Sequence, residues 1–206
     1  MSCFKWIWLA LFFVFFILMF NITINYFPYK NDVAFLQIKQ TEVQNISSYI
    51  YFFYIHVTTS LFTLLAGFTQ FNIQLLKNNP KTHSKLGKIY VYTVLFAAAP
   101  SGLWIGFFAN GGFYSKLSFI ILGTLWWLTT LIGLLKIQKK EINLHKKWML
   151  RSFALACSAI TLRLWKVILV YLFQPSPMEL YQIIAWLGWI PNLLLIEYYI
   201  KNKIKS

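Results

Sequence analysis

Three histidines, His56, His83 and His145, lie within or next to apolar stretches of this 206-residue chain. His83 and His145 each follow a basic segment and stand just before a long apolar run, whereas His56 lies inside such a run. Imidazole nitrogens ligate the iron of a b-type haem, which takes one nitrogen from each side of its plane. We therefore predict that His83 and His145 are the metal ligands of one haem.

The cations near these two histidines fit the same interpretation. Haem carries anionic propionates, and we expect Lys85, Lys147 and Arg151 to neutralise them and complete the cofactor-binding site. The alternative is structural, because a histidine at a helix start also satisfies backbone groups and anchors the helix among lipid headgroups. Glu197 falls near the same membrane boundary as Arg151, and the two predict an ion pair.

A second polar group is predicted nearer the other side of the membrane. Positions spaced by three and four within residues 49–76 are small or polar, which in a membrane bundle predicts a face turned towards protein. They are His56, Ser60, Thr63, Gly67, Gln70 and Gln74. Arg163 lies too deep in a later run to reach the headgroups, so we expect it to face protein or a wet cavity and to share a buried polar site with His56.

Other reaction classes find no support in the sequence. The chain contains no His-Glu-x-x-His, Cys-x-x-Cys, Gly-rich phosphate loop or Gly-x-Ser-x-Gly, which leaves hydrolase, kinase and zinc-finger functions without a motif. A zinc ion would need at least a third ligand beside His83 and His145, and Glu197 is the acid that the sequence offers.

Composition identifies the solvent of this chain as lipid. Hydrophobic residues make up 59% and charged residues 12%, against about 45–50% and about 25% in soluble domains. Backbone groups in hydrocarbon must be paired within their own helix or a closed barrel, and the apolar runs are too long for barrel strands. We predict an all-α integral membrane protein with six transmembrane helices and no separate soluble domain. The runs span residues 6–27, 49–76, 88–109, 115–135, 148–173 and 180–200.

The basic residues predict the topology. A net charge of +14 would suggest nucleic acid in a soluble chain, but these cations cluster between apolar runs and act as topology signals, so no nucleic-acid partner is expected. Most of them, from Lys5 to Lys205, fall on one side of a six-helix chain. Both termini are therefore predicted to be cytoplasmic, in a bacterial plasma or inner membrane.

We divide the chain into a first helix with its outer loop (1–48), a five-helix membrane domain (49–200) and a basic cytoplasmic tail (201–206). The second to fifth helices are expected to form a four-helix core. His83 and His145 lie 62 residues apart in similar surroundings, which suggests that helices two–three and four–five are parallel repeats. Pro191 predicts a kink in helix six, and Trp126 is expected to face lipid.

Several segments together resemble a known family. They are His56, the stretch His83–Tyr90, the stretch His145–Ser152, Arg163, and the stretch Trp186–Glu197. They resemble a bacterial predicted-membrane-protein family known as a domain of unknown function, number twenty-three oh six, over about residues 50–200. The resemblance implies a multi-pass membrane protein and no particular activity. The architecture is also similar to the cytochrome b561 group, which carries haem-ligating histidines on all four core helices; here the fourth helix has none, so one haem is the most that this similarity implies.

Three functions remain open from the sequence. The first is a membrane redox protein with a haem at His83 and His145 and a quinone as a partner. The second is a non-enzymatic membrane assembly or interaction factor, for example for a respiratory complex. The third is a proton-coupled transporter using His56 and Arg163, which ranks last because no pair of broken helices is predicted. The sequence leaves the oligomeric state and any substrate open.

Overall fold

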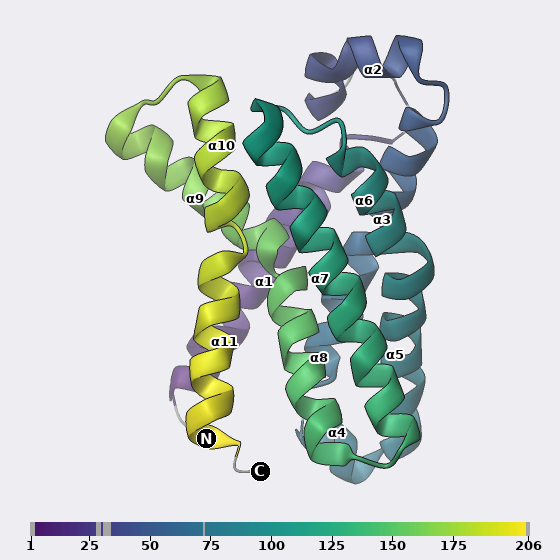
Figure 1. The fold of residues 1–206 in the computed structure, drawn as a ribbon. Coiled ribbons are helices and arrows are strands. Elements are labelled where there is room, and N and C mark those ends of the chain that lie inside the picture. Colours follow the sequence, from purple (N-terminus) through teal and green to yellow (C-terminus); the bar gives the residue numbers. More distant parts are fainter. Residues whose placement is uncertain (1–2, 28–29, 31–33, 72, 205–206) are drawn as a thin grey trace.

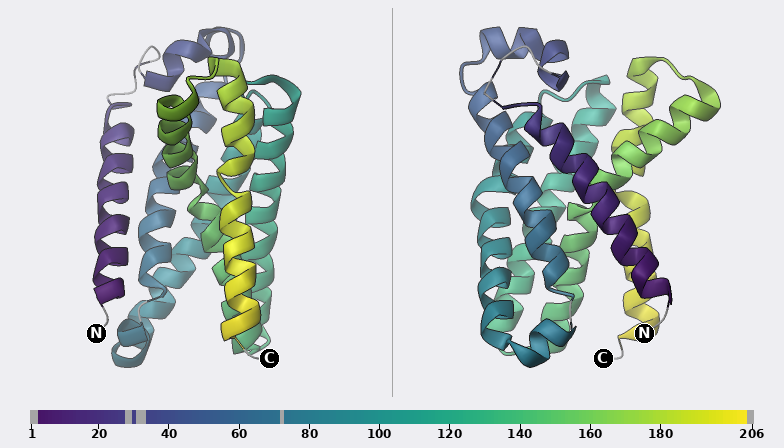
Figure 2. Two further views of the ribbon diagram at one scale, coloured as in Figure 1. Left: turned by 90° about the vertical axis from the view of Figure 1, so that its left-hand side faces the viewer. Right: turned by 180° about the vertical axis from the view of Figure 1, so that it is seen from behind.

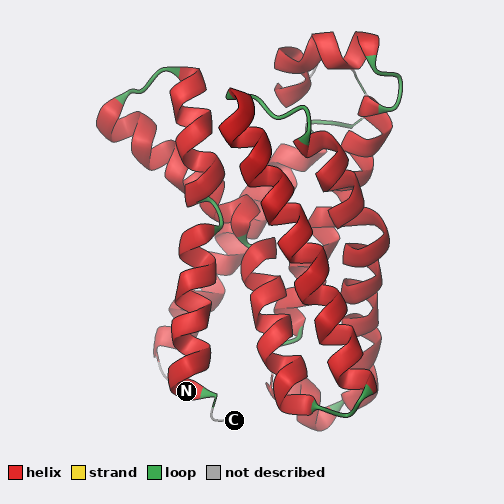
Figure 3. Cartoon of the chain, viewed as in Figure 1, coloured by secondary structure: helices red, strands yellow, loops and turns green. Residues whose placement is uncertain are grey.

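The protein is built from helices throughout its described residues, which are 3–27, 30, 34–71 and 73–204 of a computed structural model. Figure 3 shows helices joined by short loops, with no strand in this part of the chain. The elements are α1 (Cys3–Ile24), η1 (Ala34–Lys39), α2 (Gln40–Asn45), α3 (Tyr49–Thr69), α4 (Ile73–Asn78), α5 (Pro80–Thr93), η2 (Val94–Ala98), α6 (Ala99–Gly106), α7 (Gly112–Gln138), α8 (Ile142–Ala156), α9 (Ser158–Phe173), α10 (Pro177–Leu187) and α11 (Ile190–Lys203).

Five helical stretches in this part of the chain are long and apolar enough to cross a bilayer. They are Tyr49–Thr69, Pro80–Gly106, Gly112–Gln138, Ile142–Phe173 and Pro177–Lys203. Helix α1 adds a shorter apolar stretch, Phe13–Ile24. The predicted all-α membrane fold is confirmed. Both ends of the chain lie at the same end of the bundle (Figure 1), and their cytoplasmic location stays a prediction.

The core is a four-helix arrangement, as expected from the sequence. Helix α3 packs on α5, η2, α6 and α8, and α7 packs on α6 and α8. The consecutive elements α5, η2 and α6 form one continuous member of the four-helix core. Helix α10 covers α7, and α11 covers α8. Helix α1 crosses the face seen from behind obliquely and packs on α3 (Figure 2). We call the end that carries both termini the basic end.

The helix boundaries differ from the predicted runs in two places. The run at 49–76 ends early, since α3 stops at Thr69 and α4 is a separate short helix. The helix of the run at 88–109 starts early, at Pro80. Pro80 occupies the first turn of α5, where the backbone N–H that proline lacks would have no partner within the helix. The Asn79 side chain caps α5 by accepting from the Thr82 backbone N–H at 3.1 Å. Of the basic residues used for topology, Lys205 lies outside the described residues, as does the side chain of Lys5.

Two spans are broken in the middle, although the sequence predicted a kink in only one of them, helix six. One bends at Cys157 between α8 and α9, and the other at Gly188 and Trp189 between α10 and α11, just before Pro191, where a kink was predicted. The Asn192 amide donates to Thr161 Oγ1 at 2.9 Å and to the Ala154 carbonyl at 3.2 Å. The two breaks are thus joined to each other, and the sequence argument that ranked transport last no longer holds.

Thr161 completes this junction by donating its hydroxyl to the Gly188 carbonyl. Ser118 of α7 binds the other side of the break, since it donates to the Ala185 carbonyl at 2.8 Å and accepts from Trp189 Nε1 at 3.0 Å. Carbonyls that a broken helix leaves free are costly in lipid unless a side chain satisfies them. Beyond the breaks, the α9–α10 hairpin leans away from the bundle (Figure 1).

A polar network lies in the buried core where α5, α7 and α8 meet. The Tyr90 hydroxyl and Ser152 Oγ are 2.7 Å apart, Ser152 Oγ is 2.7 Å from Thr130 Oγ1, and Trp126 Nε1 points at the Tyr90 hydroxyl from 3.4 Å. Trp126 is only 7% exposed, so the expectation that it faces lipid was wrong. The indole N–H explains the difference, because it finds a hydrogen-bond acceptor inside the protein and would have none among the acyl chains.

Replacing Tyr90 by phenylalanine removes the hydroxyl that links α5 to α8 and leaves Ser152 with Thr130 alone. We expect Tyr90→Phe to lower the free energy of unfolding in detergent micelles by about 1 kcal/mol. Tyr92→Phe is the matched control, because Tyr92 is 49% exposed on the same helix, and it should leave the unfolding free energy unchanged. Equal effects of the two substitutions would contradict a role for the network.

Candidate functional site

His145 lies in the first turns of α8 with one ring nitrogen fixed by the protein. Its Nδ1 is 2.7 Å from the backbone carbonyl of Gly133 on α7. A carbonyl accepts only from a protonated nitrogen, so this contact fixes the tautomer with hydrogen on Nδ1 and leaves Nε2 with its lone pair. This is the arrangement in which protein histidines ligate metals through Nε2.

His83 lies in the first turns of α5 and has a buried atom that the described chain does not satisfy. Its Nδ1 is shielded from solvent and has no hydrogen-bond partner there. A buried polar atom without a partner in a native fold calls for an explanation, and a bound group is one of the possible causes.

The register of α5 and α8 explains why the two rings meet. Tyr90 follows His83 by seven residues, and Ser152 follows His145 by seven. Seven residues are close to two helical turns, so His83 lies on the same face of α5 as Tyr90, and His145 on the same face of α8 as Ser152. Each histidine is about 10 Å nearer the basic end. The Tyr90 hydroxyl contacts Ser152 at 2.7 Å, so His83 and His145 lie at a similar level of the bundle, on the basic side of this contact.

Gln70, the last residue of the polar line on α3, borders the His83 site. With its amide turned so that both atoms find partners, the side chain donates to the His83 carbonyl at 3.3 Å and accepts from the Gly87 N–H at 3.2 Å. A Cβ on Gly87 would lie 2.8 Å from the end of the Gln70 amide, so glycine is needed for this approach. Gln70 therefore ties the end of α3 to α5 beside the predicted haem ligand.

The predicted propionate partners differ in their surroundings. Arg151 forms a bidentate pair with Glu197, at 2.5 Å from Nε to Oε1 and 3.0 Å from Nη2 to Oε2, which confirms the predicted ion pair. Its guanidinium also lies 4.5 Å from the centre of the Trp148 ring. Lys85 is exposed and Lys147 is partly buried, and neither has a carboxylate partner among the described ion pairs.

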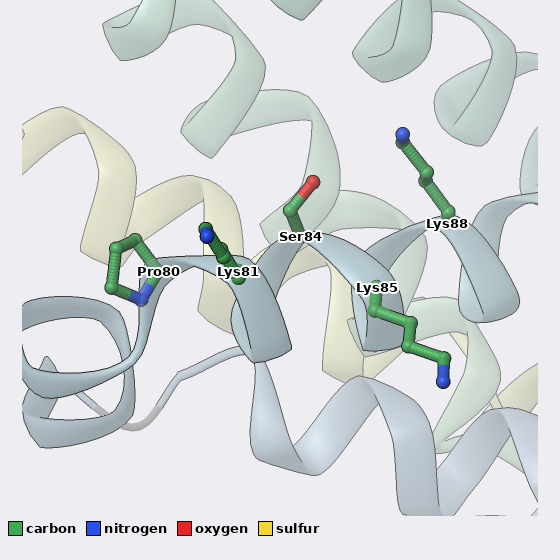
Figure 4. A pocket seen from close by; sticks show the side chains of 5 residues that line it. All are labelled: Pro80, Lys81, Ser84, Lys85 and Lys88. Carbon is green, nitrogen blue, oxygen red and sulfur yellow. The ribbon is translucent and has the colours of Figure 1, made fainter.

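Lys85 belongs to a shallow depression along α5 that also includes Pro80, Lys81, Ser84 and Lys88. Figure 4 shows the Ser84 and Lys88 side chains rising from one side of the helix and Lys85 pointing to the other. The depression is strongly cationic and lies at the basic end, directly beside His83 in sequence.

A site for a bare metal ion finds no support in the described part of the chain, because no three His, Cys, Asp or Glu side chains come together there. Glu197, the third zinc ligand that the sequence offered, is instead paired with Arg151. The His83 and His145 pair thus stands without a third protein ligand.

His56 occupies a different level of the bundle. Its Nδ1 is 2.9 Å from the Ala98 carbonyl at the end of the π-helical segment η2, and Ser60 Oγ lies 3.5 Å from the ring. The π-helix precedes Pro100, which lacks the N–H that would bond the Leu95 carbonyl; Trp127 Nε1 donates there instead, at 3.1 Å. A Cβ on Gly102 would lie 2.7 Å from His56 Cε1, so the imidazole needs glycine at that position.

The predicted polar line on α3 holds for most of its length. Thr63 is 1% exposed and donates to the Ser60 carbonyl at 2.7 Å, and Gly67 lies against Phe153 and Tyr90. Gln74 departs from the line, because α3 ends at Thr69 and Gln74 lies exposed on α4. The line is therefore a packing face, as expected for small and polar residues in membrane bundles.

Arg163 lies on α9 with its guanidinium mostly inside the protein, as expected from its depth. One N–H donates to the Ala159 carbonyl at 2.7 Å. The charge of Arg163 acts on His56, Tyr26 and Tyr181, but the described hydrogen bonds of His56 and Arg163 go to different carbonyls, so their shared polar site stays a prediction. Burial raises the pKa of Tyr26, while a backbone hydrogen bond from Phe35 and the charge of Arg163 act in the opposite direction. The Tyr26 phenol is therefore protonated at neutral pH and able to donate.

Sequence reasoning missed both tyrosines and a buried serine near them. Tyr26 follows α1 and Tyr181 lies on α10, so no periodic pattern within one helix connects them with Arg163. Ser115 is fully buried, and its hydroxyl has no partner in the described chain. A Cβ on Gly111 would collide with both Ser115 Oγ and Tyr181 Cβ, which places these two side chains side by side.

Residues 53–200 match the family described as "Predicted membrane protein (DUF2306)". This match covers more than half of the chain and includes all three histidines and both arginines. No curated protein and no solved structure matches the chain.

An alanine at position 102 would push the His56 ring away from the Ala98 carbonyl. We expect Gly102→Ala to lower the free energy of unfolding by about 1–3 kcal/mol through overpacking, measured by denaturant titration in micelles. Gly106→Ala is the matched control on the same helix, because its methyl would meet Phe119 Cβ at 3.4 Å, an ordinary contact. The control should change stability by less than about 1 kcal/mol, and a Gly102 variant as stable as the control would refute this packing of His56.

Proposed function

We propose that this chain, which belongs to the DUF2306 family of predicted membrane proteins, holds one b-type haem between His83 and His145 and transfers electrons within the membrane. The observation that carries the proposal is the hydrogen bond between Tyr90 and Ser152, because it sets α5 and α8 in a register that puts His83 and His145 at a similar level of the bundle. Haem iron ligated by two histidines exchanges one electron at a time.

The number of side chains that could ligate a metal favours haem over a bare metal ion. Structural and catalytic zinc sites use three or four protein ligands, and no such group exists in the described part of the chain. A porphyrin supplies the equatorial nitrogens itself, so the protein needs to add only axial ligands. His83 and His145, at the same end of the bundle, are the candidates for these two ligands.

The state of each imidazole also fits axial ligation. His145 donates from Nδ1 to the Gly133 carbonyl, which keeps Nε2 unprotonated and orients the ring. His83 has a buried Nδ1 without a partner in the described chain, so its ring is not held by the protein alone. A group bound between the rings would fix its orientation.

The role of the nearby cations follows from their pairing. Arg151 is already neutralised by Glu197, so we assign to it the positioning of α8 against α11 instead of contact with propionates. Lys85 and Lys147 have no such partner among the described ion pairs. They lie close in sequence to His83 and His145 and suit anionic groups at the basic end.

The test is an absorption spectrum of the protein purified from cells supplied with haem. We expect a reduced-minus-oxidised difference spectrum of b type, with about one haem per chain by pyridine haemochrome assay. His83→Ala and His145→Ala should each abolish the band, and His56→Gln, the third membrane histidine, should retain it.

Size-exclusion profiles of the variants separate loss of haem from loss of fold, and added imidazole should restore part of the band in His145→Ala by occupying the vacated position. Colourless wild-type protein from haem-supplied cells would refute the proposal. So would a band of full strength in both histidine variants.

A further inference from the structure

A row of exposed cations follows one face of α5 from its first turns. Lys81, Lys85 and Lys88 are all exposed, and spacings of four and three residues place them on one face of the helix. Together with Pro80 and Ser84 they line an open depression of about 440 Å³. Lys88 rises from one side of the helix and Lys85 extends from the other (Figure 4), so ammonium groups border the depression on two sides.

No described carboxylate pairs with these lysines. Residues 43–140, which include all of α5, contain no Asp or Glu. The acids that the structure describes are engaged elsewhere: Glu42 with Lys39, Glu141 with Lys136, Glu197 with Arg151, and Glu179 in the cap of α10. Asp32 lies outside the described residues. The described part of the chain therefore gives this depression an excess of positive charge, which suits an anion.

The same face of α5 becomes apolar and aromatic beyond Lys88. Tyr92 and Phe96 follow Lys88 at intervals of four residues, so they continue the row along the helix axis. Tyr92 is 49% exposed and Phe96 is 76% exposed, and their rings stack with centres 6.1 Å apart. Tyr90 and Val91, on the other face, are buried in the bundle. The outer face of α5 thus carries cations first and exposed rings next.

This order follows the layers of a bilayer. The row from Lys81 to Lys88 covers about 10 Å of the helix axis, at the basic end of a stretch, Pro80–Gly106, that is long enough to cross the membrane. Lysines at this level hold their ammonium groups among headgroups, and exposed rings farther along the helix contact acyl chains. An acidic soluble protein would match the cations alone, whereas a lipid contacts both the cations and the rings.

We propose that the outer face of α5 is a binding site for an anionic phospholipid. Its phosphate lies in the depression with Lys81, Ser84 and Lys88, and an acyl chain lies along Tyr92 and Phe96. Ammonium groups and a hydroxyl donate to phosphate oxygens. A headgroup with a net negative charge is preferred over a zwitterionic one, because no described carboxylate lines the depression to bind a choline cation.

The test uses the full chain, purified in neutral detergent and stripped of lipid. We expect phosphatidylglycerol to raise the melting temperature, and phosphatidylcholine with the same acyl chains to raise it much less. Inorganic phosphate and polyglutamate should leave it unchanged. The double variant Lys81→Gln with Lys88→Gln should weaken phosphatidylglycerol binding at least about tenfold, as measured by the mole fraction of lipid in the micelle at half of the full shift.

The matched control removes two exposed lysines from another helix at the basic end, Lys201→Gln with Lys203→Gln on α11, and should bind lipid as the wild type does. Lys81→Arg with Lys88→Arg keeps both charges and should also bind, which separates loss of charge from loss of fold. Lys85 stays unchanged in every variant because it is also a predicted propionate partner. The haem band should persist throughout, so failure here is distinguishable from failure of the proposed function.

Four results would overturn the proposal. Equal shifts with phosphatidylglycerol and phosphatidylcholine would show that the headgroup charge is not recognised. Equal weakening in the α11 control would assign the effect to the general charge of the basic end, and unchanged binding in the α5 double variant would place the lipid elsewhere. An equal shift with inorganic phosphate or polyglutamate, lost in the α5 double variant, would assign the depression to free phosphate or to an acidic protein.

Discussion

The hydrogen bond between Tyr90 and Ser152 is the interaction on which the rest of the structure depends. Lipid offers no partner to either hydroxyl, so α5 and α8 satisfy both only in one register. Thr130 and Trp126 extend the contact to α7. Once this register is set, the spacing of about two turns places His83 and His145 at a similar level near the basic end.

The broken helices separate two regions of different character. On the basic side of the breaks α7 and α8 pack on each other, and His83 and His145 are partly buried. On the other side the α9–α10 hairpin leans outwards (Figure 1), and Arg163 donates to the Ala159 carbonyl of its own helix. Thr161 and Asn192 stabilise this geometry, because Thr161 donates to the Gly188 carbonyl at one break and Asn192 donates to Thr161. The junction therefore holds the hairpin at a defined angle and does not leave it loose.

Much of this fold follows from the sequence, and the exceptions have physical causes. Long apolar runs fix the helices, and Pro191 marks its kink. The bend at Cys157 has no proline or glycine beside it from which it could be predicted. It arises from contacts with the other broken helix, where Asn192 donates to the Ala154 carbonyl. The pairing of His83 with His145 around a haem stays a prediction. The hydrogen bonds of Ser118 with Ala185 and Trp189 could not be predicted, since they join segments that meet only in the folded protein.

Electron paramagnetic resonance of the oxidised, purified protein tests the central claim most directly. Two imidazoles on opposite sides of ferric haem make the iron low-spin, whereas a single histidine ligand leaves it high-spin. The register of α5 and α8 predicts a low-spin ferric signal in the wild type and no haem signal in His83→Ala or His145→Ala, which lose the cofactor. A high-spin signal in the wild type, or no ferric haem signal at all, would contradict the claim that His83 and His145 share one ligand.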